Sequence, residues 1–315
     1  MALESILEGF AMRVFVTGAS GFVGSAIVKD LLDAGHTVLG LARSDASAAS
    51  IAAAGASVHR GSLEDHDSLR RGVAMTEGVI HTAFIHDFSN MPAAGETDRR
   101  AIEAMGEALA GSGRPLVVTS GLGVVMKTPL ATEDQAADLR AGIPHRVASE
   151  ELTLSLASRG VRASVLRLPP SVHGEGDHAF VPALIAIART KGESAYIGDG
   201  RNRWPAVHRL DAARLFRLAL EHGTAGSRYH GIADEGVQLR DIAEVIARRL
   251  NIPLVSKSPE EAAAHFGWLA RFAEIDRPAS SAQTQERLGW RPTHPGLLAD
   301  LDQAHYFEST PEVMI

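Results

Sequence analysis

The chain of 315 residues contains no cysteine, so it forms no disulfide, no thiolate metal site and no cysteine nucleophile. Aromatic residues make up only 5% of it, and no uninterrupted apolar run is long enough to cross a bilayer. A basic excess is absent too: the formal net charge is −7, which argues against nucleic acid as a partner. Glu4 and Glu8 stand where a secretory signal peptide would be basic. We therefore expect a soluble, cytoplasmic protein whose partner is a small-molecule substrate, not nucleic acid or a membrane.

Hydrophobic residues make up 45% of the chain, enough for one large α/β unit or two joined lobes. The most informative segment is TGASGFVG at 17–24, which follows the apolar run 14–16 and precedes apolar residues at helical spacing. This order predicts a strand, a tight turn and a helix whose first N–H groups face a pyrophosphate. Gly18 permits the turn, Gly21 lets backbone approach the phosphates, and Gly24 lets the helix pack closely. The cofactor-binding residues predicted here are Gly18, Ser20, Gly21, Phe22, Val23 and Gly24.

The end of the next strand, expected at 38–41, indicates which dinucleotide binds. An NAD site has an acidic residue about 20 positions beyond the glycines, whereas an arginine accommodates the 2′-phosphate of NADP. Ala42 stands at the acidic position and is followed by Arg43 and Ser44. We predict NADP(H), with Arg43 and Ser44 at the phosphate. Asp45 leaves NAD open as the alternative.

Strand-like and helix-like segments alternate as far as Arg167, which predicts a doubly wound parallel sheet in an α/β Rossmann fold. Further strands are expected at 57–59, 78–82, 116–120 and 163–167, and helices at 47–54, 65–73, 97–110 and 145–159. Residues 1–11 are an expected N-terminal extension. The predicted Rossmann domain comprises 12–168 and about 204–232, and a smaller, mostly helical substrate-binding lobe comprises 169–203 and 233–315.

Several motifs resemble the extended and atypical short-chain dehydrogenase/reductase superfamily, which includes NAD(P)-dependent epimerases, dehydratases and dihydroflavonol reductases. Besides TGASGFVG, they are GSLED at 61–65, VIHTA at 79–83, VTS at 118–120, RLPP at 167–170, and WPAVH at 204–208 followed by Asp211. The segment GSLED resembles the family's GDLxD motif, with Ser62 replacing the usual aspartate. The cofactor-binding residues that the resemblance implies are Ser62, Leu63, Thr82, Ala83, Phe84, Thr119, Arg146 and Pro169.

The catalytic positions depart from the family pattern. The family's tyrosine falls on Gly142, its lysine on Arg146 and its serine on Gly121, so the chain resembles an atypical branch without the tyrosine–lysine pair. Histidine titrates near neutral pH and arginine stabilises an oxyanion, so we predict His145 as acid/base and Arg146 as its electrostatic partner. Ser120, at a strand end, is the third catalytic candidate. Alternatively, His145 and Arg146 flank a helix and face water.

Residues of several segments are candidates for substrate binding, with core packing as the alternative for Phe84 and Trp204. The substrate-binding residues predicted are His86, Ser120, His173, Tyr196 and Trp204. His173 also begins a histidine- and carboxylate-containing segment at 173–178, but its spacing matches no established zinc or calcium signature, so we predict no metal.

Together these features predict an NADP(H)-dependent oxidoreductase acting on a carbonyl or alcohol of a small apolar or aromatic substrate. Two alternatives remain: an NADP(H)-binding sensor without turnover, and an epimerase or dehydratase of nucleotide sugars. The helices expected at 97–110 and 145–159 resemble the pair through which family members often dimerise, so a homodimer is predicted.

Overall fold

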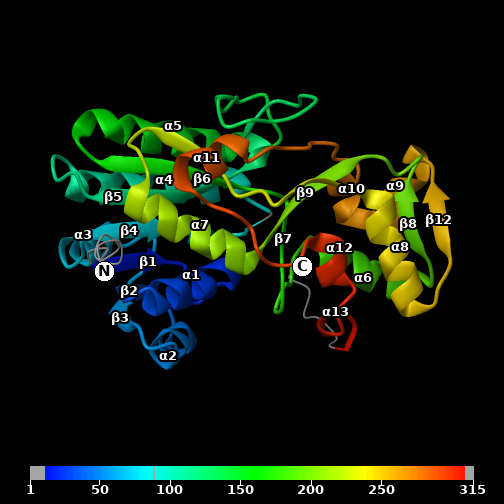
Figure 1. Cartoon of the computed structure of the whole chain (residues 1–315), viewed down its shortest axis with the longest axis horizontal. Helices are drawn as coiled ribbons and strands as arrows, with labels where there is room; N and C mark the ends of the chain where they lie inside the picture. Colours follow the sequence, from blue (N-terminus) through cyan, green and yellow to red (C-terminus); the bar gives the residue numbers. More distant parts are fainter. Residues whose placement is uncertain (1–10, 88, 309–315) are drawn as a thin grey trace, which may run out of the picture. The chain divides into compact units, whose positions relative to one another are not determined.

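The computed structural model describes residues 11–87 and 89–308 (Figure 1). The expected N-terminal extension, apart from its last residue, lies outside the described residues. The described chain divides into two compact units. Unit 1 comprises 11–120, 144–166 and 213–229, and unit 2 comprises 121–143, 167–212 and 230–308.

Unit 1 is built on a seven-stranded sheet with the order β10-β6-β5-β4-β1-β2-β3. Its strands are β1 (Arg13–Thr17), β2 (Thr37–Ala42), β3 (Ser57–Arg60), β4 (Gly78–His81), β5 (Pro115–Gly121), β6 (Arg162–Leu168) and β10 (Ser227–His230). The pairs β1/β2, β2/β3, β1/β4 and β4/β5 are parallel. The strands are short and largely buried, as expected when helices cover a parallel sheet. This confirms the predicted Rossmann-type α/β fold.

Helices connect these strands in the alternation that the sequence predicts. They are α1 (Phe22–Asp33), α2 (Asp45–Ala53), α3 (His66–Ala74), α4 (Met91–Leu109), α5 (Val147–Ser155) and α7 (Arg209–His222), with short 3-10 turns η2 (Pro144–Arg146) and η3 (Leu156–Arg159). Buried side chains of α3, α4 and η3 form one apolar cluster with those of the central strands. This packing fixes α4 and the η2–α5 segment beside the sheet.

Unit 2 contains two small sheets besides its helices. A three-stranded sheet joins β7 (Ser171–His173), β9 (Arg203–His208) and β11 (Asp234–Gln238), and a two-stranded sheet joins β8 (Ser194–Ile197) and β12 (Leu254–Lys257). The helical elements are α6 (Phe180–Lys191), α8 (Leu239–Leu250), α9 (Pro259–Phe266), η4 (Gly267–Leu269), α10 (Ala270–Ala273), α11 (Ala282–Leu288), α12 (Leu297–Leu301) and α13 (His305–Glu308), with η1 (Leu122–Val124). An apolar core that includes the fully buried Trp204 holds the unit together.

Three expected boundaries differ from the structure. The segment 204–208 does not rejoin the Rossmann sheet: β9 pairs with β7 and β11, and the chain returns through α7 and β10. Helix α4 begins at Met91 instead of 97, because the Asn90 side chain caps the N–H of Ala93 and proline is tolerated in a first turn. The single helix expected at 145–159 is instead the series η2, α5 and η3.

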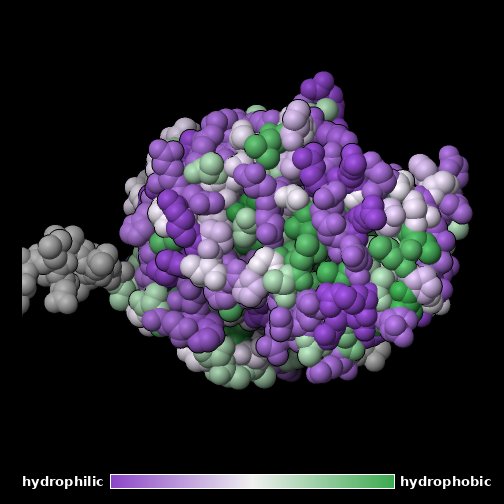
Figure 2. Space-filling view, turned by 45° about the vertical axis from the view of Figure 1, so that its right-hand side comes forward, coloured by the Kyte–Doolittle hydropathy of each residue, from purple (hydrophilic) through white to green (hydrophobic). Residues whose placement is uncertain are grey.

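Apolar side chains of both units are concentrated in their cores, and the surface is chiefly polar. Figure 2 shows one face on which hydrophilic residues predominate, with apolar residues in small groups between them. Among the helices in the described part of the chain, none combines the length and the apolar character that crossing a membrane requires.

Candidate active site

The glycine-rich turn between β1 and α1 has the geometry of a phosphate cradle. Gly18 has a φ of 70°, and a Cβ there would lie 2.7 Å from Thr82 Oγ1. A Cβ on Gly24 would lie 1.9 Å from the Gly18 carbonyl oxygen, so only glycine lets α1 approach the turn. Gly21 is the N-cap of α1 and provides no side-chain hydrogen bond, and the first turn carries no acidic residue. The first N–H groups of α1 are therefore suited to an anion.

Two arginines stand at the ends of neighbouring strands: Arg43 directly follows β2, and Arg60 is the last residue of β3. Arg43 is exposed and follows Ala42, which is buried, while Arg60 lies opposite Ala42 in the register of the two strands. Ser44 caps α2 by accepting a hydrogen bond from the N–H of Ser47. Arg60 Nη2 lies 2.6 Å from Asp45 Oδ1. Sequence analysis missed Arg60, although its place directly before the GSLED motif was a usable signal.

The other predicted cofactor residues of unit 1 lie at strand ends or just beyond them. Leu63 is buried, and the Ser62 carbonyl accepts a hydrogen bond from the N–H of Asp65. Thr82 Oγ1 donates to the Thr17 carbonyl, and Thr119 Oγ1 donates to the His81 carbonyl. The Thr82 and Thr119 hydroxyls thus satisfy strand-end backbone. Pro169 is buried and belongs to unit 2.

The guanidinium of Arg146, at the end of η2, is held on three sides. Its Nη1 lies 3.2 Å from Asp98 Oδ2, and its Nη2 donates to the Thr119 carbonyl at 3.1 Å. Its central carbon lies 4.1 Å from the centre of the Phe84 ring, a cation–π distance. Only 12% of the Arg146 side chain is exposed. The alternative in which Arg146 simply faces water is therefore wrong for this residue.

Asp98, on α4, is the partner that sequence analysis missed. It is 1% exposed, and its Oδ1 lies 3.1 Å from Nε2 of the fully buried His81. The Nδ1 of His81 in turn lies 2.7 Å from Thr17 Oγ1. Burial acts to raise the pKa of Asp98, but the charge of Arg146 and the hydrogen bond from His81 outweigh it and lower that pKa. Asp98 is therefore a carboxylate at neutral pH.

His145 and His86 both contact the ring of Phe84. The ring centroids of His145 and Phe84 are 6.1 Å apart, and the ring of His86 meets Phe84 edge to face at 5.3 Å. Burial, and secondarily the charge of Arg146, lowers the pKa of His145 below its usual value. His145 is thus a neutral imidazole at neutral pH. The structure brings together the predicted residues His86, Phe84, His145 and Arg146.

Ser120 is engaged by a carboxylate. It is 5% exposed, and its Oγ donates to Glu150 Oε2 at 2.9 Å. The other oxygen of Glu150 lies 3.2 Å from Arg228 Nε. The Ser120 hydroxyl therefore already donates its proton to a buried partner, which sequence analysis did not anticipate.

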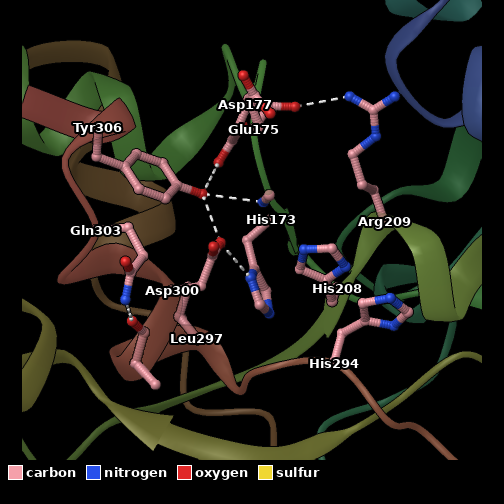
Figure 3. Close-up of polar contacts among 12 residues, drawn as sticks. His173, Glu175, Asp177, His208, Arg209, His294, Leu297, Asp300, Gln303 and Tyr306 are labelled. Carbon is pink, nitrogen blue, oxygen red and sulfur yellow. Dashed lines mark hydrogen bonds and ion pairs between the residues drawn. The ribbon is translucent and has the colours of Figure 1, made fainter. Parts of the chain in front are cut away.

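The predicted substrate residues of unit 2 lie in different surroundings. His173 is completely buried, and its Nδ1 pairs with Asp300 Oδ2 at 2.8 Å in a cluster that includes Tyr306 (Figure 3). Trp204 is also completely buried, and its indole donates to the Phe272 carbonyl, so core packing accounts for it. Tyr196 is partly exposed, with the Arg240 guanidinium 5.5 Å from its ring centre.

Carboxylates and imidazoles gather in this cluster of unit 2 without the arrangement of a metal site. Asp177 and Asp300 both contact the Tyr306 hydroxyl, as the dashed lines in Figure 3 show. Within the residues that the structure describes, no three or more histidine, aspartate or glutamate side chains are placed to hold a metal ion.

Comparisons with known proteins place this geometry in a family. The model of the NAD dependent epimerase/dehydratase family matches residues 14–232. An uncharacterized protein of Schizosaccharomyces pombe is 55% identical, over 94% of this chain and 100% of its own. The 4-hydroxy-2-methyl-3-oxo-4-farnesyl-3,4-dihydroquinoline-1-oxide ketoreductase of Stigmatella aurantiaca is 29% identical, over 85% of this chain and 84% of its own.

The fold is also found among solved structures. A dTDP-glucose 4,6-dehydratase of Streptomyces venezuelae, with NAD and TYD bound, superposes with a TM-score of 0.76 at 19% identity. The match covers 94% of this chain and 97% of that one. The chain therefore belongs to the NAD dependent epimerase/dehydratase family.

Proposed function

We propose that the protein is an NADP(H)-dependent oxidoreductase acting on a carbonyl or alcohol of a small apolar or aromatic substrate. One observation carries the proposal. Arg146, at the position of the family's lysine, is a largely buried cation held by Asp98, the Thr119 carbonyl and the Phe84 ring. A fixed cation near a titratable histidine is what carbonyl reduction requires in place of a tyrosine–lysine pair. The similarity to a ketoreductase adds support.

A bound nicotinamide would supply or accept the hydride. The residues of the chain would stabilise the charge that forms on the substrate oxygen and would transfer the proton. A guanidinium has five N–H donors. Nη1 of Arg146 is buried in the ion pair with Asp98, and Nη2 donates one N–H to the Thr119 carbonyl, so Nε and the second N–H of Nη2 would serve a substrate oxygen that becomes negative. His145, being neutral, takes the proton of an alcohol during oxidation and returns it during reduction.

Preference for NADP(H) follows from the basic residues at the ends of β2 and β3. Arg43 is exposed, Arg60 is paired across the strands with Ala42, the residue before Arg43, and Ser44 caps α2. Asp45, the residue that could favour a ribose hydroxyl, is paired with Arg60. Two guanidinium groups beside a helix N-terminus favour a phosphate dianion over a hydroxyl.

A sensor without turnover is the second candidate, favoured by the engagement of Ser120 with Glu150 and by glycine at the tyrosine position. In either case we propose a cytoplasmic homodimer that associates through α4 and α5. Light scattering of the purified protein tests the dimer, and a monomer mass would refute it.

The experiment is a titration of the purified protein with NADPH and NADH, followed by cofactor-oxidation assays against ketones, aldehydes, quinones and imines. We expect tighter binding of NADPH, and turnover that His145→Ala and Arg146→Ala each reduce by at least about 100-fold. Arg70→Ala removes a surface ion-paired arginine and is the control. NADPH binding without turnover on any substrate would favour the sensor. Unchanged turnover in both variants would refute the catalytic assignment.

A further inference from the structure

We propose that Asp98 is the positioning residue of Arg146, and that His81 and Thr17 connect this pair to the phosphate-binding turn. The inference deepens the proposed function and rests on it. The chain of contacts runs from Arg146 Nη1 to Asp98 at 3.2 Å, from Asp98 to His81 Nε2 at 3.1 Å, and from His81 Nδ1 to Thr17 Oγ1 at 2.7 Å. Every member belongs to unit 1.

Burial makes the members of this chain depend on one another. Thr17 and His81 are 0% exposed and Asp98 is 1% exposed. A buried charge that loses its partner is strongly unfavourable, so Asp98 and the sequestered part of Arg146 require each other. Because Asp98 is ionised, its Oδ1 can only accept, so the N–H of His81 must lie on Nε2. The hydrogen on Nε2 and the orientation of the His81 ring are thereby specified.

The backbone around α4 is shaped for this pair. Gly95 lies one turn before Asp98, and a Cβ on it would lie 2.5 Å from the His145 carbonyl oxygen. The missing side chain lets η2 lie directly against α4, with Arg146 beside the Asp98 carboxylate. Arg146 is a long side chain with many rotamers, and a partner that holds one of them prepares the guanidinium before substrate arrives.

The other end of the chain reaches the cofactor turn. Thr17 immediately precedes Gly18, its Oγ1 accepts from the N–H of Ala83 at 3.3 Å, and its carbonyl accepts from Thr82 Oγ1 at 2.8 Å. His81 therefore ties the end of β4 to the end of β1 as well as to Asp98. We infer that a cofactor bound at the turn and the orientation of Arg146 are coupled through these residues.

A double-mutant cycle of Asp98→Asn and Arg146→Met tests the inference. Asparagine has nearly the same shape as aspartate, so Asp98→Asn removes the charge with little change in volume. We expect Asp98→Asn to lower kcat by about 10- to 100-fold with a smaller change in KM, and to weaken NADPH binding. In the Arg146→Met background the same change should have no further effect on kcat or on NADPH affinity.

The control is Glu133→Gln, which neutralises another buried carboxylate, one that accepts from the Thr284 N–H and hydroxyl in unit 2. It should lower stability to urea without altering NADPH affinity or kcat. If Asp98→Asn behaves like Glu133→Gln, or if its effect persists at full size in the Arg146→Met protein, Asp98 does not position Arg146.

A readout without cofactor or substrate separates this inference from the proposed function. In the ¹⁵N spectrum of the free protein, we expect resolved, slowly rotating guanidinium signals of Arg146, assigned by their loss in Arg146→Met. These signals should collapse in Asp98→Asn and persist in Glu133→Gln. Collapse in a protein that never turns over NADPH would refute the oxidoreductase and support the inference, whereas persistence in Asp98→Asn would refute the inference alone.

Discussion

Substitution of Gly95 by alanine is the most specific perturbation of the Arg146 site. A methyl carbon at Gly95 would lie 2.5 Å from the His145 carbonyl oxygen, and ordinary contact begins at 3.4 Å. The η2 turn must therefore retreat by about 0.9 Å, because the obstacle is backbone and cannot rotate away. Displacement of a catalytic group by about 1 Å costs on the order of 100-fold in rate, so we expect kcat/KM to fall by about that factor.

Stability should change much less than activity. Alanine gains about 1 kcal/mol over glycine in a helix interior, while overpacking costs about 1–3 kcal/mol, so the net destabilisation is between about 0 and 2 kcal/mol. Urea unfolding measures this difference, and steady-state kinetics on the best substrate measures the rate. Gly106→Ala is the matched control on α4, because its Cβ would meet the Leu156 side chain at 2.6 Å, which is not catalytic backbone. Equal losses of activity in the two variants, or full activity in Gly95→Ala, would contradict the account.

Three further predictions concern proton transfer, cofactor choice and pH. Because the pKa of His145 lies below its usual value, the rate of alcohol oxidation should rise with pH and reach its plateau at a lower pH than an ordinary histidine would give. His145→Ala should lose this rise, and an unchanged pH profile would count against the base assignment. Arg43→Ala and Arg60→Ala should each weaken NADPH binding about 10-fold and leave the affinity for NADH nearly unchanged, as measured by calorimetric titration. Equal losses of affinity for both cofactors would refute the phosphate site. Burial raises the pKa of Asp177 from 3.8 to about 6. The protonated carboxyl group therefore makes its full contribution to the free energy of unfolding below about pH 3.8, and this contribution is lost as the pH rises through 6. Asp177→Asn should therefore gain stability relative to the natural protein between pH 4 and pH 8, by at most about 3 kcal/mol, and a difference that does not vary with pH would refute this.

Local patterns predicted most of unit 1, because its strands and helices carry their own signals. The apolar run before TGASGFVG is β1, and the helix after it is α1. Misplacement of 204–208 has a physical reason: β9 is as buried as a Rossmann strand, but its partners β7 and β11 are set by tertiary contacts. The one local difference is Pro205, a residue that central strands of a parallel sheet disfavour.

The candidate site was predicted only where a motif or the family pattern marked a position. Arg146 and His145 were found by counting from flanking motifs, and the structure does bring them together at Phe84. Asp98 was not found, although it lies at helical spacing from the apolar residues Ala101, Ile102 and Met105, which was a usable signal of burial. Its partner could not be predicted, because Arg146 lies 48 residues further along the chain. The burial of His173 against Asp300 likewise joins residues 127 positions apart.

Hydride transfer itself provides the most direct test of the central claim. The protein is incubated with NADPH that carries deuterium at the transferable position of C4, together with the best carbonyl of the panel, and the product is analysed by mass spectrometry. The account predicts an alcohol one mass unit heavier, with deuterium on the former carbonyl carbon, and far less of it from Arg146→Ala. Tight NADPH binding with no labelled alcohol from any substrate would contradict an oxidoreductase.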